Sequence, residues 1–326
     1  MGGTPAHGPL DRGQRPTHDR HRRLSLRDVS AKNWTLRTAV ARATVRCSPS
    51  SIALIEEDRA PKGDPRPVAR VAAVMAAKNT PQLIPYCHSV ALDWVGVEFE
   101  LGSDRIEIIV RVKAVYKTGV EMEALAGAAA AALNIYDLLK PVDDDMMIER
   151  IELLEKTGGK SNARDLLERS WRAAVLVCSD RASAGEYVDR SGPVLVDGLT
   201  NLGAEPAGYR VVRDEVDAIQ SAIREWVAES VDIIFVSGGS GLADRDVTPA
   251  AVVPMLEKRL SGVEAHYQSY SQARVPTSML SRPVAGLIGK TLVVTIPGSP
   301  GAAQDALDAL FPYLLHALDL ENHPTP

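Results

Sequence analysis

The pattern of hydrophobic and polar positions divides this chain of 326 residues into parts of different character. Residues 1–24 are rich in Gly, Pro, His and Arg and lack hydrophobic periodicity, which predicts a disordered extension. In residues 25–160, alternating segments such as 97–101 and 105–112 accompany a long alanine-rich helical stretch. This mixture predicts an α+β domain, with helices packed on an antiparallel sheet.

A second pattern of hydrophobic positions begins after residues 161–170. These residues lack the hydrophobic spacing of a buried core and are predicted to be a short linker. In 171–326, apolar runs are bounded by Gly, Pro or Asp, which is typical of buried parallel strands. The predicted strands are 173–178, 231–236 and 291–296. The predicted helices are 193–202, 217–229, 249–260 and 302–318. The C-terminal domain is therefore expected to be a doubly wound α/β fold with ligands at the carboxyl ends of its strands.

Composition excludes several classes of function. A net charge of −5 argues against a nucleic-acid-binding surface. Charged residues are expected to interrupt every apolar run well before it reaches bilayer-spanning length, so neither a transmembrane helix nor a membrane partner is expected. Cys47, Cys87 and Cys178 show no C-x-x-C spacing, which argues against a disulfide framework or a structural zinc site and favours a cytoplasmic location.

The first candidate chemistry lies at the two ends of the alanine-rich helix. Thr118 and Glu121 have the spacing of a capping box, and Pro141 is expected to end the helix. Asp137 and Lys140, three residues apart, can form an ion pair on one face. A helix cap and a simple ion pair are thus structural alternatives to catalytic roles at these positions.

The length of this helix limits what one chain can do. Glu121 and Asp137 are sixteen residues apart, which is about 24 Å along a helix at 1.5 Å per residue. One small substrate cannot touch both ends. If both are catalytic, either sites combine subunits or the ends serve different parts of the ligand, and we favour a homo-oligomer with interfacial sites.

Motifs along 26–161 extend this hypothesis. They are Asp28-Val29-Ser30, Lys62-Gly63-Asp64, Ala76-Ala77-Lys78, Leu83-Ile84-Pro85-Tyr86-Cys87-His88, Thr118-Gly119-Val120-Glu121-Met122-Glu123-Ala124-Leu125, Tyr136-Asp137 with Lys140, and Lys156-Thr157-Gly158-Gly159-Lys160-Ser161. In these motifs the domain resembles the cyclic pyranopterin monophosphate synthase (MoaC) family, although Ser89 stands where that family usually has proline. The resemblance implies conversion of 3′,8-cyclo-7,8-dihydro-GTP into cyclic pyranopterin monophosphate, with release of pyrophosphate.

The same resemblance implies roles for individual residues. Asp137 and Lys140 would be the acid/base pair, with a lysine pKa lowered by burial or neighbouring cations. His88 would assist ring opening or hold the pterin together with Glu121 and Glu123, although a core histidine is the structural alternative. The remaining substrate-binding residues would be Lys62, Lys78, Lys156 and Lys160 for phosphates, with Cys87, for which a packing role is the alternative, and Met122.

A glycine-rich loop carries the candidate chemistry of the second domain. It follows a predicted strand and reads Ser237-Gly238-Gly239-Ser240-Gly241-Leu242-Ala243-Asp244-Arg245-Asp246-Val247-Thr248-Pro249. Its glycines permit positive φ angles and an anion-binding nest of amides. No G-K-[ST] follows, so it is not a P-loop, which disfavours a GTP-binding regulator. A plain tight loop, with Thr248 and Pro249 as N-cap and first helical residue, is the alternative.

Several motifs of this domain should converge, because Ser179-Asp180, the glycine loop and Pro297-Gly298-Ser299-Pro300 each follow a predicted strand. Further motifs are Arg181, Asp189-Arg190-Ser191-Gly192, Asp214-Glu215 and Met279-Leu280-Ser281-Arg282. Through all of these, residues 171 to 320 are similar to the MogA/MoaB molybdopterin-binding family. Adenylylating members of that family transfer AMP from ATP to molybdopterin and release pyrophosphate.

This second resemblance implies that Asp214 and Asp246 are catalytic and direct Mg²⁺, with a helix cap as the alternative for Asp214. Arg282 is expected either to contact phosphate or to form a surface ion pair. The implied substrate-binding residues are Asp180, Gly238, Gly239, Ser240, Gly241 and Ser299. Mg²⁺ and ATP are the expected cofactors, and no tightly bound organic cofactor is expected.

Together the two resemblances predict a bifunctional enzyme of molybdenum cofactor synthesis, a lyase followed by a nucleotidyltransferase. Its expected partners are small molecules: the cyclised dihydro-GTP, molybdopterin and ATP. The alternative is an active synthase fused to a non-catalytic molybdopterin-binding module. Transfer of AMP to molybdopterin would distinguish the two readings.

Overall fold

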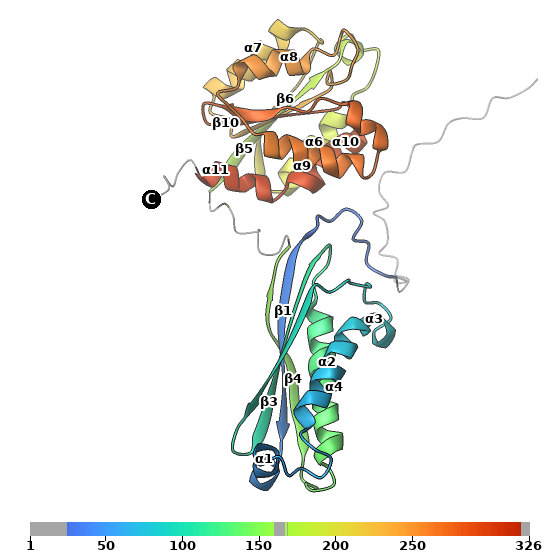
Figure 1. The fold of residues 1–326 in the computed structure, drawn as a ribbon. Coiled ribbons are helices and arrows are strands. Elements are labelled where there is room, and N and C mark those ends of the chain that lie inside the picture. The colour runs from blue at the N-terminus through green and yellow to red at the C-terminus, as the bar shows by residue number, and fades with distance from the viewer. Residues whose placement is uncertain (1–24, 160–166, 168, 321–326) are drawn as a thin grey trace, which may run out of the picture.

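The computed structural model describes residues 25–159, 167 and 169–320. The predicted extension 1–24, the candidate residue Lys160 and most of the predicted linker 161–170 lie outside the described residues. Two domains of different architecture follow one another along the chain (Figure 1).

The N-terminal domain is an antiparallel four-stranded sheet in the order β2-β3-β1-β4, with helices α2 and α4 packed on one face (Figure 1). The predicted α+β class is therefore confirmed. The pairing of β1 with β3 runs from Thr35 opposite Tyr116 to Arg46 opposite Arg105. The elements are β1 (Thr35–Arg46), α1 (Pro49–Glu56), α2 (Pro65–Lys78), α3 (Thr80–Leu83), β2 (Trp94–Leu101), β3 (Arg105–Tyr116), α4 (Glu121–Leu139) and β4 (Met147–Thr157).

Small side chains allow this sheet and its helices to approach closely. Ala41 and Ala43 point from β1 into the core, while Arg42 between them lies on the opposite face of the strand and pairs with carboxylates there. On α4, a Cβ added at Gly127 would lie 3.1 Å from Cγ1 of Val110. The apolar middle of α4 is thus a close-packing face, as predicted.

The composition of α4 has a structural explanation. By length and composition alone this helix could cross a membrane, so the expectation that charges interrupt every long apolar run is wrong here. In the structure α4 packs against α2, β1, β3 and β4, and side chains such as Ala128, Ala131 and Ile135 are fully buried. The role of a core helix accounts for its apolar sequence.

The two ends of α4 differ in how well they were predicted. The helix begins at Glu121, with Val120 at the N-cap and no side-chain capping bond. The predicted capping box at Thr118 is therefore wrong, because the helix starts later than this box requires. The helix ends at Leu139, which confirms the predicted end before Pro141.

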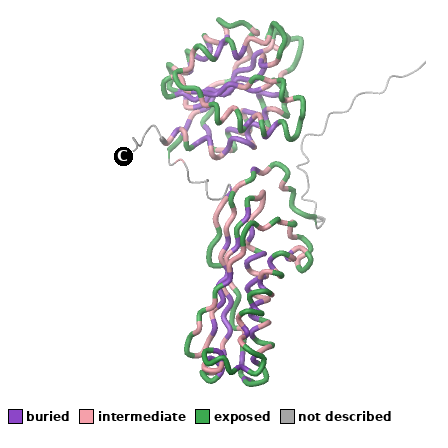
Figure 2. Tube along the Cα trace, in the orientation of Figure 1, coloured by how far each residue is buried: buried purple, intermediate pink, exposed green. Residues whose placement is uncertain are grey.

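The C-terminal domain is a mixed six-stranded sheet in the order β6-β5-β7-β10-β9-β8. The first four strands in this order are parallel, and β9 and β8 continue the sheet in antiparallel pairs. Helices α7 and α8 cover one face and α6, α9 and α10 the other, so the sheet is a buried middle layer (Figures 1 and 2). The predicted α/β class is confirmed, with an antiparallel edge that was not foreseen. The elements are β5 (Trp171–Cys178), α5 (Asp180–Ser183), α6 (Ser191–Asn201), β6 (Ala204–Val212), α7 (Val216–Ala228), β7 (Ile233–Ser237), α8 (Thr248–Val252), β8 (Lys258–Arg259), α9 (Ser261–Gln272), β9 (Ala285–Ile288), β10 (Thr291–Ile296), α10 (Pro300–Leu310) and α11 (His316–Leu320).

Prolines shorten two of the predicted helices. The helix expected at 249–260 gives way to a 3-10 turn that contains Pro254, because proline has no amide proton to continue an α-helix. The chain then pairs as β8 with β9. The helix expected at 302–318 breaks at Phe311, which is extended as residues before proline tend to be. Strand β6 and helix α9 were not predicted.

Candidate active sites

Helix α4 separates the N-terminal candidate residues into two groups. At its C-terminal end, the Nζ atom of Lys140 lies 2.7 Å from Oδ1 of Asp137. From the loop before α2, Nζ of Lys62 lies 3.6 Å from the other carboxylate oxygen of Asp137 and donates to its carbonyl oxygen at 3.2 Å. All three side chains are exposed. One chain therefore holds two ammonium groups around one carboxylate at this end.

The charges in this first group correct one expectation. The hydrogen bond and charge of Lys140 lower the pKa of Asp137, and Lys62 adds to the effect. The same bond raises the pKa of Lys140. The expected lowering of the lysine pKa is therefore wrong for the single chain, because Lys140 is exposed and bonded to an anion. In this arrangement Lys140 is a cation suited to binding phosphate.

The second group lies at the N-terminal end of α4. Glu123 is buried, with a relative exposure of 1%, and its Oε1 atom accepts a hydrogen bond from Sγ of Cys87 at 3.4 Å. Its Oε2 atom is buried without a hydrogen-bond partner. On the first turn, Oε1 of Glu121 lies 3.3 Å from Nζ of Lys156 on β4. This group offers an acid with an unused oxygen beside an ion pair.

Burial sets the protonation of the groups beside Glu123. It raises the pKa of Glu123 and, with help from the nearby carboxylates, raises the pKa of Cys87 to about 11. Cys87 is accordingly a neutral thiol at pH 7 and not a nucleophilic thiolate, which agrees with its packing interpretation. The same burial shifts Glu123 toward its protonated form, the state required to donate a proton to a ligand.

The other N-terminal candidates lie in less defined surroundings. Lys78 is in the last turn of α2, and Met122 is exposed beside Glu121. The ring of His88 does not join the Glu123 group: its Nε2 atom lies 2.7 Å from the carbonyl oxygen of Arg27. His88 is half-buried at the surface, so the core-histidine alternative is wrong.

Sequence reasoning missed Arg37, a cation beside the second group. Its Nε donates to the carbonyl of Tyr116 at 3.2 Å, next to the turn that enters α4. Gly158 and Gly159 have φ angles of +98° and +79°, and a side chain at Gly159 would collide with the guanidinium of Arg37. These glycines are needed for the approach of Arg37, which alternation along a strand does not reveal.

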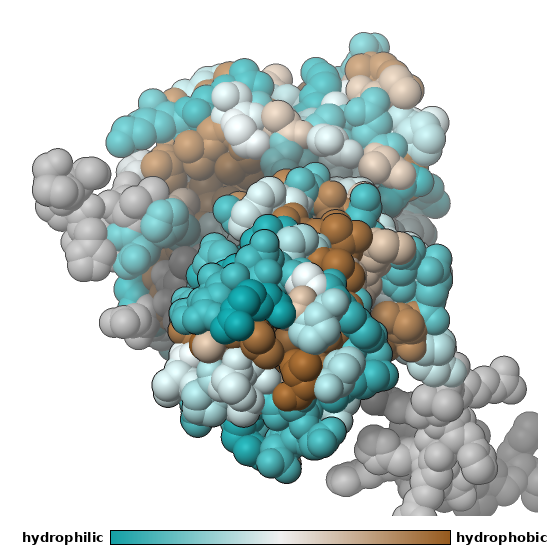
Figure 3. All heavy atoms as spheres, turned by 60° about the horizontal axis from the view of Figure 1, so that its bottom comes forward, coloured by the Kyte–Doolittle hydropathy of each residue, from teal (hydrophilic) through white to brown (hydrophobic). Residues whose placement is uncertain are grey.

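The helix face between the two groups carries exposed apolar side chains. Val71 and Met75 of α2 are 60% and 58% exposed, and Leu133 of α4 is 60% exposed. Figure 3 shows hydrophobic side chains gathered in a band on the N-terminal domain. Such a band is uncommon on a surface that faces only water.

In the C-terminal domain, two carboxylates meet where adjacent strands end. Asp180 follows β5 and Asp214 follows β6. The amide of Asp180 donates to Oδ2 of Asp214 at 3.1 Å, and the amide of Asp214 donates to Oδ1 of Asp180 at 3.1 Å. This reciprocal pair fixes both side chains. The helix-cap alternative for Asp214 is wrong, because Glu215 is the N-cap of α7 and has no side-chain capping bond.

Asp214 also carries an unused oxygen. Its Oδ1 atom is buried without a hydrogen-bond partner. Burial raises the pKa of Asp214, and the neighbouring carboxylates of Asp180 and Asp246 contribute to that rise. A buried carboxylate oxygen crowded by negative charge is a position where a cation or a proton is favoured.

The glycine loop reaches the same place. Gly238 and Gly239 have φ angles of +105° and +60°, as an anion-binding turn requires. A Cβ at Gly239 would lie 2.9 Å from Oδ1 of Asp214, and one at Gly241 would lie 2.8 Å from Oδ2 of Asp246. A Cβ at Gly298 would lie 3.2 Å from Cα of Gly238, so the predicted convergence of the loop with residues 297–300 is confirmed. The approach of the loop to Asp214, the partner of Asp180, was not predicted from the strand pattern.

Two residues thought to cap or to bind phosphate instead shape this loop. The hydroxyl of Thr248 donates to the carbonyl of Gly238 at 2.9 Å, and the N-cap of α8 is Val247. The guanidinium of Arg282 donates to the carbonyls of Gly241 and Asp246 at 2.9 and 2.7 Å. The N-cap interpretation of Thr248 is wrong, and Arg282 holds the loop through backbone carbonyls.

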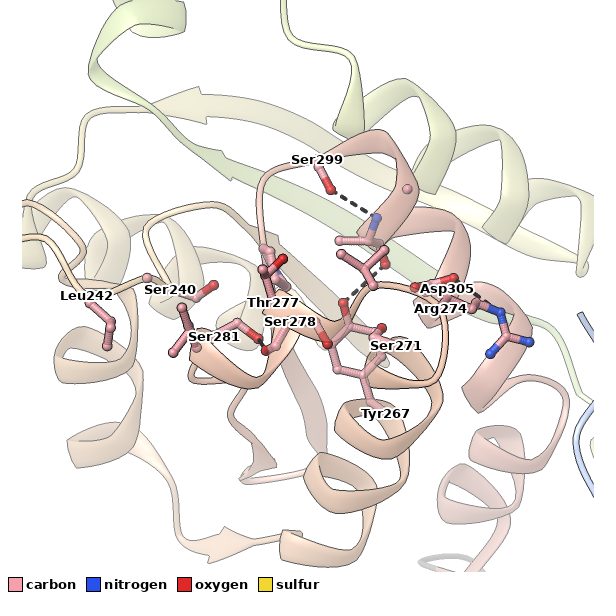
Figure 4. Close-up of a pocket in the computed structure, with 16 residues that line it drawn as sticks. Ser240, Leu242, Tyr267, Ser271, Arg274, Thr277, Ser278, Ser281, Ser299 and Asp305 are labelled. Atoms are coloured by element: carbon pink, nitrogen blue, oxygen red, sulfur yellow. Dashed lines mark hydrogen bonds and ion pairs between the residues drawn. The ribbon is translucent and has the colours of Figure 1, made fainter.

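A cavity of about 520 Å³ opens beside the loop (Figure 4). Ser240 and Ser299 line it, and the hydroxyl of Ser299 also caps α10 by accepting from the amide of Ala302 at 3.1 Å. Tyr267 and Ser278, which sequence reasoning missed, lie on its other side. The hydroxyls of Ser240 and Ser278 are buried without a partner. The cavity is thus mostly apolar with unused hydroxyls, as expected for a flat polar ligand.

Comparison with known proteins places both domains. Residues 26–159 match the model of the MoaC family, and residues 174–316 match the model of the probable molybdopterin binding domain. The molybdenum cofactor biosynthesis bifunctional protein of Chlorobaculum tepidum is 42% identical over 305 residues, which cover 93% of this chain and 97% of that protein. The chain belongs to this bifunctional family.

Single-domain relatives agree with this assignment. The bifunctional chain is 52% identical over 136 residues to the cyclic pyranopterin monophosphate synthase of Clostridium perfringens, covering 41% of this chain and 86% of that protein. A solved structure of MogA is 37% identical and covers 45% of this chain and 97% of that chain, with a TM-score of 0.44. The two family matches show that the protein combines a MoaC domain with a MogA/MoaB-like domain.

The side chains near Asp214 in the second domain can be compared with the oxygen ligands that the expected Mg²⁺ requires. Among the described residues, no group of three or more His, Cys, Asp or Glu side chains is arranged to hold a metal. However, the unpartnered Oδ1 of Asp214 beside Asp180 and Asp246 suits a cation that also takes oxygens from phosphate and water. The described residues around Asp214 therefore fit Mg²⁺ brought with a nucleotide better than a metal held by protein side chains alone.

Proposed function

We propose that the N-terminal domain converts 3′,8-cyclo-7,8-dihydro-GTP into cyclic pyranopterin monophosphate and releases pyrophosphate. The two ammonium groups of Lys62 and Lys140 around Asp137 support this proposal, because they can neutralise a triphosphate while the carboxylate moves a proton. Glu123, a buried acid with a free oxygen, can protonate the ring that opens. Lys156 and Glu121 would orient the same ligand.

The synthase site is proposed to combine two copies of the chain in a homo-oligomer. The two groups lie at opposite ends of α4, an intact helix of 19 residues, so one chain cannot bring both to one small substrate. The exposed apolar residues of α2 and α4 provide a face on which a second copy can pack. A partner copy that lies against this face can supply the group from the other end.

The C-terminal domain is proposed to transfer AMP from ATP to molybdopterin. The observation that carries this proposal is the meeting of Asp180, Asp214 and the glycine loop beside one cavity. Asp214 and Asp246 would hold Mg²⁺ with the nucleotide, whose charge it would neutralise when bound. The amides of Gly238 to Gly241 would bind the phosphates, and the unpartnered hydroxyls of the cavity would bind the pterin. We propose the cytoplasm as the location of both reactions, which the three free cysteines support because thiols stay reduced there.

Two assays on the purified chain test both halves of this proposal. The synthase assay uses the cyclised dihydro-GTP, and the transferase assay uses molybdopterin with Mg-ATP. Asp137→Asn is expected to lower only the first rate and Asp246→Asn only the second, each by about 100-fold or more, as for the loss of a catalytic proton carrier or charge. Tight pterin binding without AMP transfer by the unchanged chain would identify the second domain as a binding module.

A further inference from the structure

The segment before β1 connects the two candidate sites. Residues 27–33, here named the strap, follow the first described residues and run beneath the C-terminal domain before the chain enters β1 (blue in Figure 1). Within the strap, Oδ1 of Asp28 accepts from the amide of Ser30 at 2.8 Å, which fixes a tight turn. The turn directs successive carbonyl oxygens toward both domains.

On the N-terminal side, the strap contacts the surroundings of the synthase groups. The carbonyl oxygen of Arg27 lies 2.7 Å from Nε2 of His88, directly after Cys87. The carbonyl of Ser30 accepts from Nζ of Lys117 at 3.4 Å. Lys117 belongs to the turn that leads into α4 and Glu121. The position of the strap is therefore tied to the N-terminal end of α4.

On the C-terminal side, the strap contacts α9, Arg274 in the turn that follows it, and α10. Nη2 of Arg274 donates to the carbonyl of Ser30 at 2.6 Å, and the hydroxyl of Tyr270 donates to the carbonyl of Ala31 at 2.8 Å. The Nδ2 atom of Asn33 donates to the carbonyl of Ala309 at 2.8 Å, and Asn33 is buried. The strap thus has three bonds to the second domain.

Arg274 is the link between the strap and the cavity. Its guanidinium lies over the ring of Tyr270, with Cζ 3.4 Å from the ring centre, and Nη1 donates to the carbonyl of Tyr270 at 2.8 Å. Its Nε atom lies 3.8 Å from Oδ1 of Asp305. Arg274 and Asp305 both line the cavity, at the end away from Ser240 and Leu242 (Figure 4). In this position the planar fork of the Arg274 guanidinium serves all of these partners together.

We propose that Arg274 is a positioning residue of the second site and that its anchor, the carbonyl of Ser30, is supplied by the synthase domain. With the strap in place, Arg274 is held beside Asp305 and fixes the acidic end of the cavity. With the strap released, Arg274 loses an acceptor and Asp305 loses a fixed cation. The inference rests on the proposed function of this cavity, the binding of molybdopterin.

A consequence of this arrangement is coupling between the two sites. A ligand that prefers the cavity with Arg274 fixed will favour the docked strap, and a docked strap holds the carbonyl of Arg27 at His88. By thermodynamic reciprocity, substrate bound at the synthase site must then favour ligand in the cavity by the same factor. Couplings of this type commonly amount to about 5- to 150-fold in affinity.

Two variants of the full chain release the strap without changing the lining of the cavity. Asn33→Ala removes the bond to Ala309 at the surface of the second domain, and combining it with Tyr270→Phe also removes the bond to Ala31. Tyr313→Phe is the matched control, because it removes a hydroxyl from the same face of the domain beside Asn33. Hydrogen exchange should show faster exchange in the strap of both variants, with the protection of β5, β7 and β10 unchanged. Asn33→Ala alone serves if the double variant does not fold.

The measurements are the Kd of molybdopterin and the synthase KM and kcat with and without saturating molybdopterin. We expect the double variant to bind molybdopterin about tenfold more weakly than the unchanged chain. The Kd of the control variant should be unchanged. In the unchanged chain, molybdopterin should lower the synthase KM severalfold with little change in kcat, and the released variants should lose this response. Equal Kd values with a visibly released strap would overturn the inference and leave the proposed function intact. Failure of the unchanged chain to bind molybdopterin would overturn the proposed function of the domain itself, and this inference with it.

Discussion

The two domains assemble their candidate sites in opposite ways. In the C-terminal domain, β5, β6 and β7 run parallel, so Asp180, Asp214 and the glycine loop all emerge at one edge of the sheet. In the N-terminal domain the strands are antiparallel, and α4 places Asp137 and Glu121 at opposite ends of 19 residues. The comparison indicates that the parallel sheet gathers its candidate residues within one chain, whereas the antiparallel domain keeps its two candidate groups apart, and under the proposed function a second copy brings them together.

The largest expected effect tests whether the synthase site of the N-terminal domain combines residues from two chains. Asp137→Asn and Glu121→Gln should each lower synthase activity by about 100-fold or more when made alone. Co-expressed, the two variants should recover about a quarter of the normal activity, because about half of the dimers are mixed and one of their two composite sites is intact. The measurement is the synthase rate of the separate and co-expressed proteins.

The control for this complementation is AMP transfer, which should be unaffected in all samples. A mixture as inactive as its components would mean that both ends of α4 act on sites within single chains. In that case the contrast between the domains would disappear, and the ends would serve different parts of one ligand.

A smaller effect is expected at the single-chain site. Gly239→Ala should lower AMP transfer by about 100-fold, since the new Cβ would lie within 2.9 Å of Oδ1 of Asp214 and would meet the hydroxyl of Thr248. The φ angle of +60° at this position adds about 1 kcal/mol of strain for alanine. Gly262→Ala is the matched control, because its Cβ would meet no atom within 4 Å. Thermal unfolding and AMP transfer measure both effects, and equal activity of the two variants would show that the loop does not approach the nucleotide.

The same contrast explains which parts of the site could be predicted from sequence. Asp180 and the glycine loop were expected to lie at one edge of the sheet because each follows a predicted strand. Asp214 was named only through the family resemblance, because strand β6 was not predicted, and its pairing with Asp180 emerges from the fold. Tyr267 was missed because α9 is largely polar and buries few side chains, so its helical period is weak. Ser278 was missed because it lies in a short 3-10 turn, Pro276–Leu280, that has no such period. The cavity wall they form depends on tertiary packing that no local pattern encodes.

The N-terminal domain shows a different limit. The ion pair of Asp137 with Lys140 follows from helical spacing alone, and the end of α4 follows from Pro141. The direction of the shift in the pKa of Lys140 did not follow, because spacing does not reveal whether a lysine is exposed and bonded or buried among cations. Arg37 was missed because only the fold brings β1 beside Gly159.

The smallest expected effect concerns stability and distinguishes two carboxyl groups at the N-terminal end of α4, those of Glu123 and Glu121. Burial raises the pKa of Glu123 above its ordinary value of 4.5. The contribution of this carboxyl to stability is therefore fully present below about pH 4.5 and is lost as the pH rises through the folded-state pKa. Glutamine does not titrate and retains an oxygen that can accept from Cys87. Glu123→Gln should thus stabilise the domain at pH 7, by about 1 kcal/mol for each unit of the shift, while synthase activity falls.

Urea unfolding between pH 4 and pH 7.5 measures this gain, which should vanish toward the acidic end of the range. Glu121→Gln is the control: its carboxylate is half-exposed and paired with Lys156, so its removal should bring no gain at any pH. A gain at Glu123 that is independent of pH would mean that packing, and not charge burial, is relieved. A gain that grows with pH would show that the domain keeps an unsatisfied acid in its core at a cost in stability, as a proton donor awaiting a ligand would require.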